Sequence, residues 1–210
     1  MKIVNRINRL FIKKFDHCWV PDFKNSLLSG ELSDSNLEKI FIGPQTRFKK
    51  IVEERKNYKY KYLAIISGPE PQRSLLEDEI QNCFLKTNEH CAIINGLTNT
   101  KEISAEKITF YPHLETTAFR ELLTKSEFVI CRSGYSSIMD LYVLQKKVLF
   151  IPTPGQTEQE YLAKYHQKTN SIYYQKQGRI DLKKASFNFI QSKSKTKKKL
   201  LEGAFNKVFL

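Results

Sequence analysis

The 210-residue sequence lacks the residue patterns that mark disulfide-rich or zinc-binding proteins. Its four cysteines, Cys18, Cys83, Cys91 and Cys131, include no C-x-x-C pair, and its four histidines form no H-E-x-x-H motif. The cysteines therefore predict reduced, buried thiols in a cytosolic protein, with neither a disulfide framework nor a zinc site.

Long apolar runs are also absent. No stretch approaches the ~18 apolar residues of a membrane-spanning helix, so the sequence predicts no transmembrane segment. The first residues lack an apolar core followed by a cleavage site, and we expect no signal peptide. The G-x-x-x-x-G-K-[ST] pattern is missing as well, which excludes a P-loop nucleotide site.

Acidic residues are fewer than basic ones. The chain has 22 Asp and Glu and 35 Lys and Arg, which gives a formal net charge of +13. This excess favours polyanionic partners, namely nucleic acid, an anionic membrane face or a phosphorylated ligand, although a basic surface can also serve solubility alone. Much of the charge lies in residues 5–15 and 193–199. No aromatic RNA-binding signature or helix-turn-helix pattern is present, and we expect no nucleic-acid partner.

From residue 60 onward, apolar runs alternate with amphipathic segments. The runs are continuous, as in parallel strands that are buried on both faces. Strands that alternate with helices predict an α/β fold, a Rossmann-like doubly wound parallel sheet. The expected strands are 62–68, 91–96, 107–112, 128–132, 147–152 and 171–175, and the expected helices are 71–86, 116–126, 136–145 and 158–168.

The flanking segments do not show this regular alternation of strands and helices. A basic amphipathic helix is expected at residues 5–15, followed by a short strand that ends at Pro21. A polar, turn-rich linker spans 23–36, and a second short strand and a polar connecting helix complete the region up to residue 59. A last helix is expected near the carboxyl terminus, within 197–209.

Three strand-to-helix turns have an unusual composition, and ligands of open parallel sheets bind at such turns. The first turn is SGPEPQRS, residues 67–74. There Gly68 permits a sharp turn, the helix start attracts phosphate, and Arg73 could add a direct charge. Taken alone, the composition is better explained as a plain turn with prolines at a helix start.

The second turn is RSGYSS, residues 132–137. Small residues here, Ser133, Gly134, Ser136 and Ser137, offer hydroxyls and close backbone approach to a diphosphate. Asp140 could then accept hydrogen bonds from ribose hydroxyls. The alternative is that Ser137 and Asp140 form a capping box without any ligand.

The third turn is PTPGQTEQEY, residues 152–161. Thr157 and Glu160 also match a capping box, so Glu160 has a structural explanation. Gln159 has no such explanation, and beside Glu160 it could bind sugar hydroxyls. Two neighbouring turns rich in small polar residues favour a nucleotide-sugar ligand more strongly than one.

These same residues carry a family resemblance. The stretch FYPHL…FVICRSGYSSIMDLYVLQKKVLFIPTPGQTEQEYLA resembles the carboxyl-terminal, donor-binding domain of glycosyltransferase family 28, which has the GT-B fold. The resemblance covers residues 60–165 and implies a UDP-sugar ligand. The backbone near Phe110 and Tyr111 would meet the uracil, and the serine turn would hold the diphosphate.

The resemblance also implies roles for the acidic and amide side chains. Asp140 stands where the family has a ribose-binding Glu, and Gln159 and Glu160 stand where it has two sugar-binding Gln. The shorter acid and the carboxylate at Glu160 are departures that leave the identity of the sugar open. His113 lies at a strand end near the site, and we interpret it as structural.

Enzymes of this architecture have two domains, and the first holds the acceptor site and the general base. The resemblance therefore implies that residues 1–22 are the end of an amino-terminal domain, 23–59 a linker, 60–190 the nucleotide-sugar-binding domain and 191–210 a basic carboxyl-terminal helix. We expect either a fragment of a longer protein or a subunit that works with a partner domain. No catalytic residue is assigned.

The implied reaction is transfer of a hexose or N-acetylhexosamine from a UDP-sugar to an acceptor hydroxyl with inversion, without metal or cofactor. The sequence does not identify the acceptor; a lipid-linked molecule or a glycan of the cell envelope would agree with the resemblance, and the basic segments suit a cytoplasmic protein that is peripheral on an anionic membrane surface. The alternatives are a non-catalytic nucleotide-sugar-binding subunit and a sugar-nucleotide epimerase.

Overall fold

The computed structural model describes residues 11, 14–33, 38–48, 57–97, 103–105 and 107–190. The chain divides into two compact units, one of Met1–Thr46 with Ser192–Leu210 and one of Arg47–Gln191, and each is described by itself. The helices expected at 5–15, before residue 59 and at 197–209 lie wholly or mostly outside the described residues.

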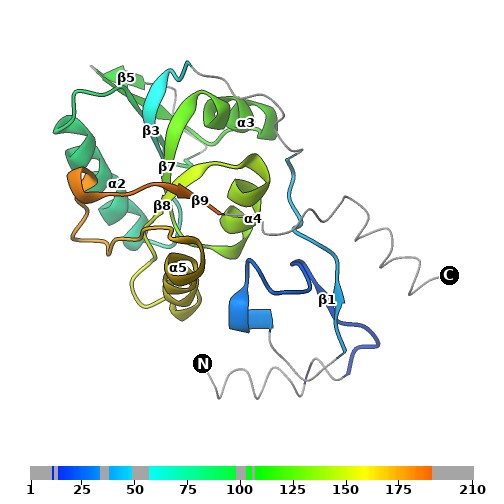
Figure 1. Ribbon diagram of the computed structural model, residues 1–210. Helices are drawn as coiled ribbons and strands as arrows, with labels where there is room; N and C mark the ends of the chain where they lie inside the picture. Colours follow the sequence, from blue (N-terminus) through cyan, green and yellow to red (C-terminus); the bar gives the residue numbers. More distant parts are fainter. Residues whose placement is uncertain are drawn as a thin grey trace. The chain divides into compact units, whose positions relative to one another are not determined.

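The larger unit is built on a seven-stranded sheet of order β5-β6-β4-β3-β7-β8-β9, shown in Figure 1. Its five central strands are parallel and its two edge strands are antiparallel, so the predicted doubly wound sheet is confirmed. The strands are β3 (Tyr60–Ile65), β4 (Cys91–Ile94), β5 (Ile103–Ala105), β6 (Ile108–Tyr111), β7 (Ser126–Cys131), β8 (Lys147–Phe150) and β9 (Asn188–Phe189), and the helices are α2 (Gln72–Leu85), α3 (Thr116–Thr124), α4 (Tyr135–Leu144) and α5 (Thr157–Asn170).

The strand order places the point where the chain reverses direction beside β3. The chain builds outward through β4 and β6, then returns to the other side of β3 and continues through β7 and β8. The last residue of β3, Ile65, pairs with the last residue of β7, Cys131. The turns that follow β3, β7 and β8 are therefore neighbours at the carboxyl edge, where ligands of doubly wound sheets bind.

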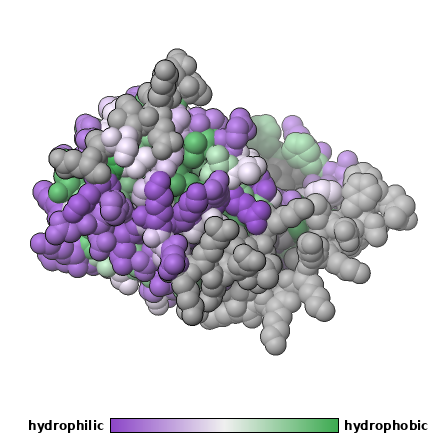
Figure 2. Space-filling model, turned by 90° about the horizontal axis from the view of Figure 1, so that it is seen from above, coloured by the Kyte–Doolittle hydropathy of each residue, from purple (hydrophilic) through white to green (hydrophobic). Residues whose placement is uncertain are grey.

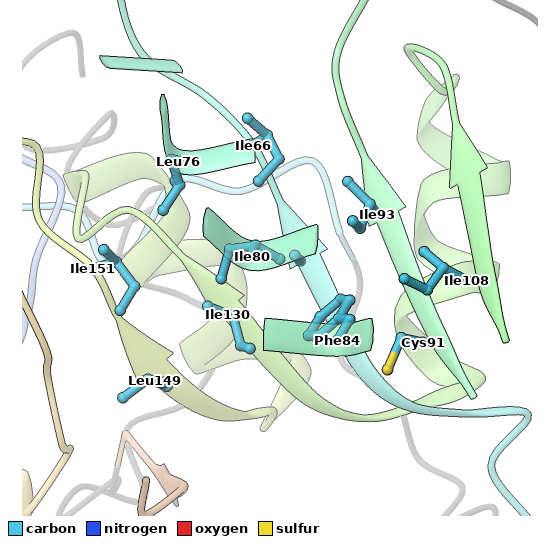
Figure 3. Close-up of a cluster of buried hydrophobic side chains, with 11 residues drawn as sticks. Ile66, Leu76, Ile80, Phe84, Cys91, Ile93, Ile108, Ile130, Leu149 and Ile151 are labelled. Carbon is cyan, nitrogen blue, oxygen red and sulfur yellow. The ribbon is translucent and has the colours of Figure 1, made fainter. Parts of the chain in front are cut away.

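A buried apolar cluster joins α2 to the sheet (Figure 3). The helix contributes Leu76, Ile80 and Phe84, spaced four residues apart so that they share one face. The strands and the positions directly after β3 and β8 contribute Ala64, Ile66, Cys91, Ile93, Ile108, Ile130, Leu149 and Ile151. Burial of each large aliphatic side chain contributes roughly 2 kcal/mol, so this cluster fixes the strands that carry the three turns.

The segment after α5 covers the same cluster without forming the strand expected at 171–175. That expectation is wrong, because only an isolated bridge joins Tyr174 to Phe150. The segment is instead held to α2 by Glu79, whose carboxylate accepts the N–H groups of Gly178 (2.7 Å) and Ile180 (2.8 Å). The edge strand β9 follows it and was not expected from the sequence.

The smaller unit contains a parallel pair, β1 (Trp19–Val20) and β2 (Ile40–Phe41), which confirms both short strands expected there. The segment expected to be a linker is ordered in its described part and includes the 3₁₀ helix η1 (Gly30–Ser33). Asp22 organises it, since its buried carboxylate accepts the N–H groups of Phe23, Leu28 and Ser29.

The surface seen in Figure 2 is mostly hydrophilic over the described residues, with small hydrophobic areas between polar ones. Among those residues, no helix has both the length and the apolar character required to span a bilayer.

Candidate functional site

Three turns meet at the carboxyl edge of the sheet, after β3, β7 and β8. A β-carbon placed on Gly68 in the first turn would lie 3.6 Å from Oγ1 of Thr153 in the third turn. The same position lies 3.9 Å from Nε of Arg132 in the second turn. Gly68 has a φ of +114°, a backbone conformation that residues other than glycine rarely adopt. The three turns therefore lie together at this edge of the sheet.

Arg132, directly after β7, ties the three turns together. Its side chain is 2% exposed, and Nη2 donates to the carbonyl oxygen of Gln72 (2.8 Å) while Nε donates to that of Ser67 (3.3 Å). Nη1 donates to the carbonyl oxygens of Ile151 (3.1 Å) and Pro152 (3.3 Å). Burial lowers the pKa of this guanidinium to about 10, which still leaves it protonated at neutral pH. None of the four hydrogen-bond partners is a carboxylate, although the charge of Glu79 acts on the guanidinium from a distance.

The second turn leads into α4 without a side-chain cap. Gly134 is the N-cap residue, and no described atom lies within 4 Å of a β-carbon built on it. The first N–H groups of a helix have no partner inside the helix, and its positive dipole end favours an anion. The hydroxyls of Ser136 and Ser137, in the first turn of α4, form no hydrogen bond within the described part of the chain. This helix start can therefore receive a phosphate.

Of the other residues predicted at the second turn, Asp140 lies on the same face of α4 as the two serines, whereas Ser133 is buried and hydrogen-bonded inside the protein. Asp140 is partly buried and lies three and four residues after Ser137 and Ser136, on the same face of α4. Ser133 is fully buried, and its hydroxyl donates to the carbonyl oxygen of Gln159 (2.7 Å). Its proton is already used inside the protein, so the predicted contact of Ser133 with a diphosphate would need its backbone N–H.

The two capping boxes considered as ligand-free alternatives are wrong, because the helices begin elsewhere. The N-cap residue of α4 is Gly134, so Ser137 lies inside the helix. The N-cap residue of α5 is Gln156, so Thr157 is the first residue of the helix. A capping box therefore does not account for either polar turn.

The first turn already contains an anion of its own. The carboxylate of Glu70 accepts the N–H of Ser74 (3.2 Å) at the start of α2 and pairs with Nε of Arg73 (2.6 Å). Arg73 also pairs with Glu77 (2.9 Å). Although burial opposes it, these two ion pairs raise the pKa of Arg73. A phosphate at this turn would have to compete with two carboxylates for Arg73.

The third turn is closed by its own side chains. Gln159 Oε1 accepts the backbone N–H of Thr153 (2.9 Å), and Gln159 Nε2 donates to Gln156 Oε1. Glu160 Oε1 accepts the N–H of Gly155 (3.1 Å). The predicted sugar-binding groups Gln159 and Glu160 are thus held in fixed orientations before any ligand binds.

Tyr111, at the carboxyl end of β6, turns its side chain away from this edge. Its hydroxyl lies 2.7 Å from that of Tyr60, the first residue of β3, and the two rings are perpendicular. Because these strands are parallel, the ring of Tyr111 points toward the opposite edge of the sheet. Only its backbone is available for the predicted contact with a uracil.

No metal centre is evident in the part of the chain that the structure describes, where no three His, Cys, Asp or Glu side chains come together. His113 is exposed and its backbone N–H donates to Leu97. Burial raises the pKa of the Cys131 thiol to about 12, so this cysteine beside the site stays protonated and unreactive.

Sequence reasoning missed two residues of this site, Arg132 and Thr153. A signal for Arg132 existed, since a cation directly after a fully apolar strand must find buried partners. Thr153 carried no signal. It is 2% exposed, and among the described residues its Oγ1 has no hydrogen-bond partner. A buried hydroxyl left in this state costs about 1–3 kcal/mol, which makes it a feature that a ligand or a water could satisfy.

Comparison with known proteins identifies the family. The profile of the glycosyltransferase family 28 C-terminal domain matches residues 86–200, more than half of the chain. This chain belongs to glycosyltransferase family 28. Its match includes the second and third turns, α4 and α5, and so contains the open helix start and the fixed amides.

A curated relative from Sulfurihydrogenibium sp. (strain YO3AOP1) is 29% identical over 167 residues, which cover 76% of this chain and 44% of that protein. It is a UDP-N-acetylglucosamine--N-acetylmuramyl-(pentapeptide) pyrophosphoryl-undecaprenol N-acetylglucosamine transferase. The family 28 chain thus spans less than half the length of this relative.

Two solved structures share the fold. Acinetobacter baumannii MurG superposes with a TM-score of 0.55 at 14% identity, covering 84% of this chain and 50% of that one. The glycotransferase of kitacinnamycin superposes with a TM-score of 0.52 at 11% identity, covering 74% of this chain and 41% of that one. These likenesses agree with the Rossmann-like half of a GT-B glycosyltransferase.

Proposed function

We propose that this family 28 chain supplies the donor-binding half of a glycosyltransferase that moves a hexose or N-acetylhexosamine from a UDP-sugar to an acceptor hydroxyl with inversion. The observation that carries the proposal is the start of α4, which has no cap and lies at the point where the chain reverses in the sheet. Such a helix start is suited to a diphosphate. The hydroxyl of Thr153, which has no hydrogen-bond partner among the described residues, and the guanidinium of Arg132 lie next to Gly68 in the first turn.

In this proposal, each turn binds a different part of the ligand. Ser136 and Ser137 with their N–H groups bind the diphosphate, and Asp140, on the same face of α4, accepts hydrogen bonds from the ribose. The backbone after β6, near Tyr111, meets the uracil. Gln159 and Glu160 lie nearest the sugar. In this proposal Arg132 does not contact the ligand, and it acts only through its positive charge and by holding the turns together.

In the reaction, the acceptor oxygen attacks the anomeric carbon from the face opposite the UDP. The bond from that carbon to the diphosphate breaks, and the diphosphate leaves with the electron pair, so negative charge grows on it. Donors that are already in place stabilise this charge without reorganising, and each is worth about 3 kcal/mol of barrier in comparable sites. The acceptor's proton passes to a base that is not assigned among these residues.

The acceptor in this proposal is a lipid-linked molecule or a glycan of the cell envelope, and the protein is cytoplasmic and peripheral on an anionic membrane. Supporting this location, residues 193–199 (KSKTKKK) are strongly cationic, and each Lys near an anionic surface contributes about 1 kcal/mol. Co-sedimentation with anionic vesicles at low salt tests it, and a chain that stays in the supernatant would contradict it.

Titration calorimetry of the full chain with UDP, UDP-sugars and ADP tests the ligand. We expect UDP to bind with a Kd of about 0.1 mM, near −5.5 kcal/mol, and ADP to bind more weakly. Replacing both Ser136 and Ser137 by Ala should weaken UDP binding about tenfold, while Ser186→Ala, an exposed serine outside the site, should have no effect. Absence of UDP binding by the wild type would refute the proposal.

A further inference from the structure

The edge of the larger unit opposite the three turns, where the parallel strands begin, is rich in lysine. We call it the basic edge, and its lysines are Lys59, Lys86, Lys107, Lys125 and Lys147. Hydrogen bonds place them side by side. The N–H of Lys59 donates to the carbonyl oxygen of Lys125 (2.9 Å), and Lys107 Nζ donates to that of Asn88 (3.3 Å), two residues after Lys86. The positive charges therefore form one continuous surface.

Few carboxylates neutralise this surface. Glu121 pairs with Lys125 (2.6 Å), and the nearby Glu127 pairs with Lys61 (2.8 Å), so both acids are already used. Glu89 is exposed beside them. Among the described residues, the lysines at positions 86, 107 and 147 have no carboxylate within ion-pair distance. The basic edge therefore has a net positive charge.

The helix dipole explains only part of this arrangement. Cations are favourable at helix carboxyl termini, and Lys86 and Lys125 are the C-cap residues of α2 and α3. Lys59 and Lys107 instead precede strands, and Lys147 begins one, so no helix end accounts for them.

Large apolar side chains are exposed at the same edge. Leu85, the last residue of α2, is 58% exposed, and Tyr58, directly before Lys59, is 45% exposed. Phe189 in β9 is 40% exposed. Single exposed apolar residues are common, but aromatic and aliphatic side chains among lysines are the composition of surfaces that bind the interface of an anionic bilayer.

Ring contacts connect these side chains across the sheet. The ring of Tyr62 stacks on Phe84 near the end of α2 (5.9 Å between centroids) and on Phe128 (5.8 Å). Lys147 Nζ lies 5.5 Å from the Phe128 ring centre and 5.6 Å from that of Phe189. A row of rings with an ammonium in it thus runs from the end of α2 to β9.

We propose that the basic edge, with the exposed Tyr58, Leu85 and Phe189, contacts the surface of an anionic phospholipid bilayer. This inference rests on the proposed function, which supports the membrane location with residues 193–199 alone, and adds a lipid-facing surface on the donor-binding unit itself. The three turns lie at the other ends of the same strands, roughly 20 Å away for a six-residue strand such as β3. At that height they meet the hydrophilic head of a lipid-linked acceptor.

Co-sedimentation of the full chain with vesicles of phosphatidylcholine, with and without phosphatidylglycerol, tests the charged part of this surface. We expect Lys86→Gln combined with Lys107→Gln to lower the affinity for phosphatidylglycerol vesicles about thirtyfold, or about 2 kcal/mol for two lysines. The control is Lys164→Gln combined with Lys176→Gln, which removes the same charge from exposed positions outside the basic edge and should have little effect.

The apolar part is tested by a pair of exposed leucines on one helix. Leu85→Gln should lower the affinity for the same vesicles about fivefold, whereas Leu75→Gln, at a 51% exposed position near the other end of α2, should leave it unchanged. Thermal denaturation checks that all the variants are folded. Residues 193–199 are intact in every variant, so a loss of binding reports on the edge.

The outcomes separate this inference from the proposals on which it rests. A wild type that binds no phosphatidylglycerol vesicles would refute the membrane location as well, whereas the UDP titration tests the donor site independently. Edge variants that bind like their controls would overturn the role of the basic edge alone. So would equal binding to pure phosphatidylcholine, or a lysine variant that loses affinity for a single-stranded oligonucleotide but not for vesicles.

Discussion

The starts of α2 and α4 face the same edge of the same sheet but differ in what they hold. At α2, the carboxylate of Glu70 accepts a backbone N–H and pairs with Arg73. At α4, the N-cap residue is Gly134, and there is neither a side-chain cap nor an acidic residue in the first turn. Equivalent positions in the fold have thus become a filled and an open anion site.

The difference shows that a helix start at a favourable place in the fold is not enough to predict a phosphate site. What matters is whether the donors there are still available. The buried guanidinium of Arg132 does not separate the two helix starts, since its hydrogen bonds go to carbonyl oxygens of the first and third turns, including that of Gln72 at the start of α2. Three substitutions would break or sharpen this contrast.

The largest effect is expected from Arg132→Met, which removes the link between the turns. Four carbonyl oxygens lose a donor, and we expect the free energy of unfolding to fall by about 3 kcal/mol. Urea denaturation measures this change, with Arg179→Met, at an exposed arginine, as the control. Arg132→Lys should lose less, since an ammonium still donates to some of the oxygens. A loss below about 1 kcal/mol for Arg132→Met would mean that the turns hold together without it.

An intermediate effect is expected from Gly134→Asp, which gives α4 the internal carboxylate that α2 has. We expect UDP affinity to fall at least tenfold, about 1.4 kcal/mol, while the melting temperature stays the same or rises, because Asp is a good N-cap. Calorimetry and thermal denaturation measure the two changes. Gly134→Ala is the control, as its φ of −71° and open surroundings accept a methyl group. Equal UDP affinity in both variants would show that the anion binds elsewhere.

The smallest effect is expected from Arg73→Met. Because Arg73 is paired with Glu70 and Glu77, UDP affinity should change by less than about twofold, or 0.4 kcal/mol. The same titration measures it beside Arg179→Met. A tenfold loss would instead restore the role that the sequence suggested for Arg73 and would remove the contrast between the two helix starts.

Sequence reasoning predicted the central sheet because its strands are long apolar runs. β3, β4, β7 and β8 are buried on both faces, and such runs are visible without any knowledge of neighbours. The edge strands β5 and β9 are two or three residues long and were missed. The strand expected at 171–175 was a wrong prediction. That segment is apolar because it packs on the cluster beside α2, and not because it pairs within the sheet.

The sequence predicted where the site lies, but not which of its side chains pair with one another. Composition located the three turns, whereas the pairing of Arg73 with Glu77, or of Ser133 with the Gln159 backbone, depends on tertiary contacts that no local pattern encodes. The capping boxes failed because a Ser or Thr three residues before an acid does not decide where a helix begins. Thr153 became a candidate only because its buried hydroxyl has no hydrogen-bond partner among the described residues.

The segment that Glu79 fastens to α2 sets a practical limit on how far the larger unit can be shortened. Phe187 stacks on Phe128 and lies against Tyr62, over the flank of the sheet that α2 leaves uncovered. Ending the chain after α5, at Asn170, would expose this aromatic surface to solvent and favour aggregation. The smallest soluble version of this unit therefore includes a stretch with almost no regular secondary structure.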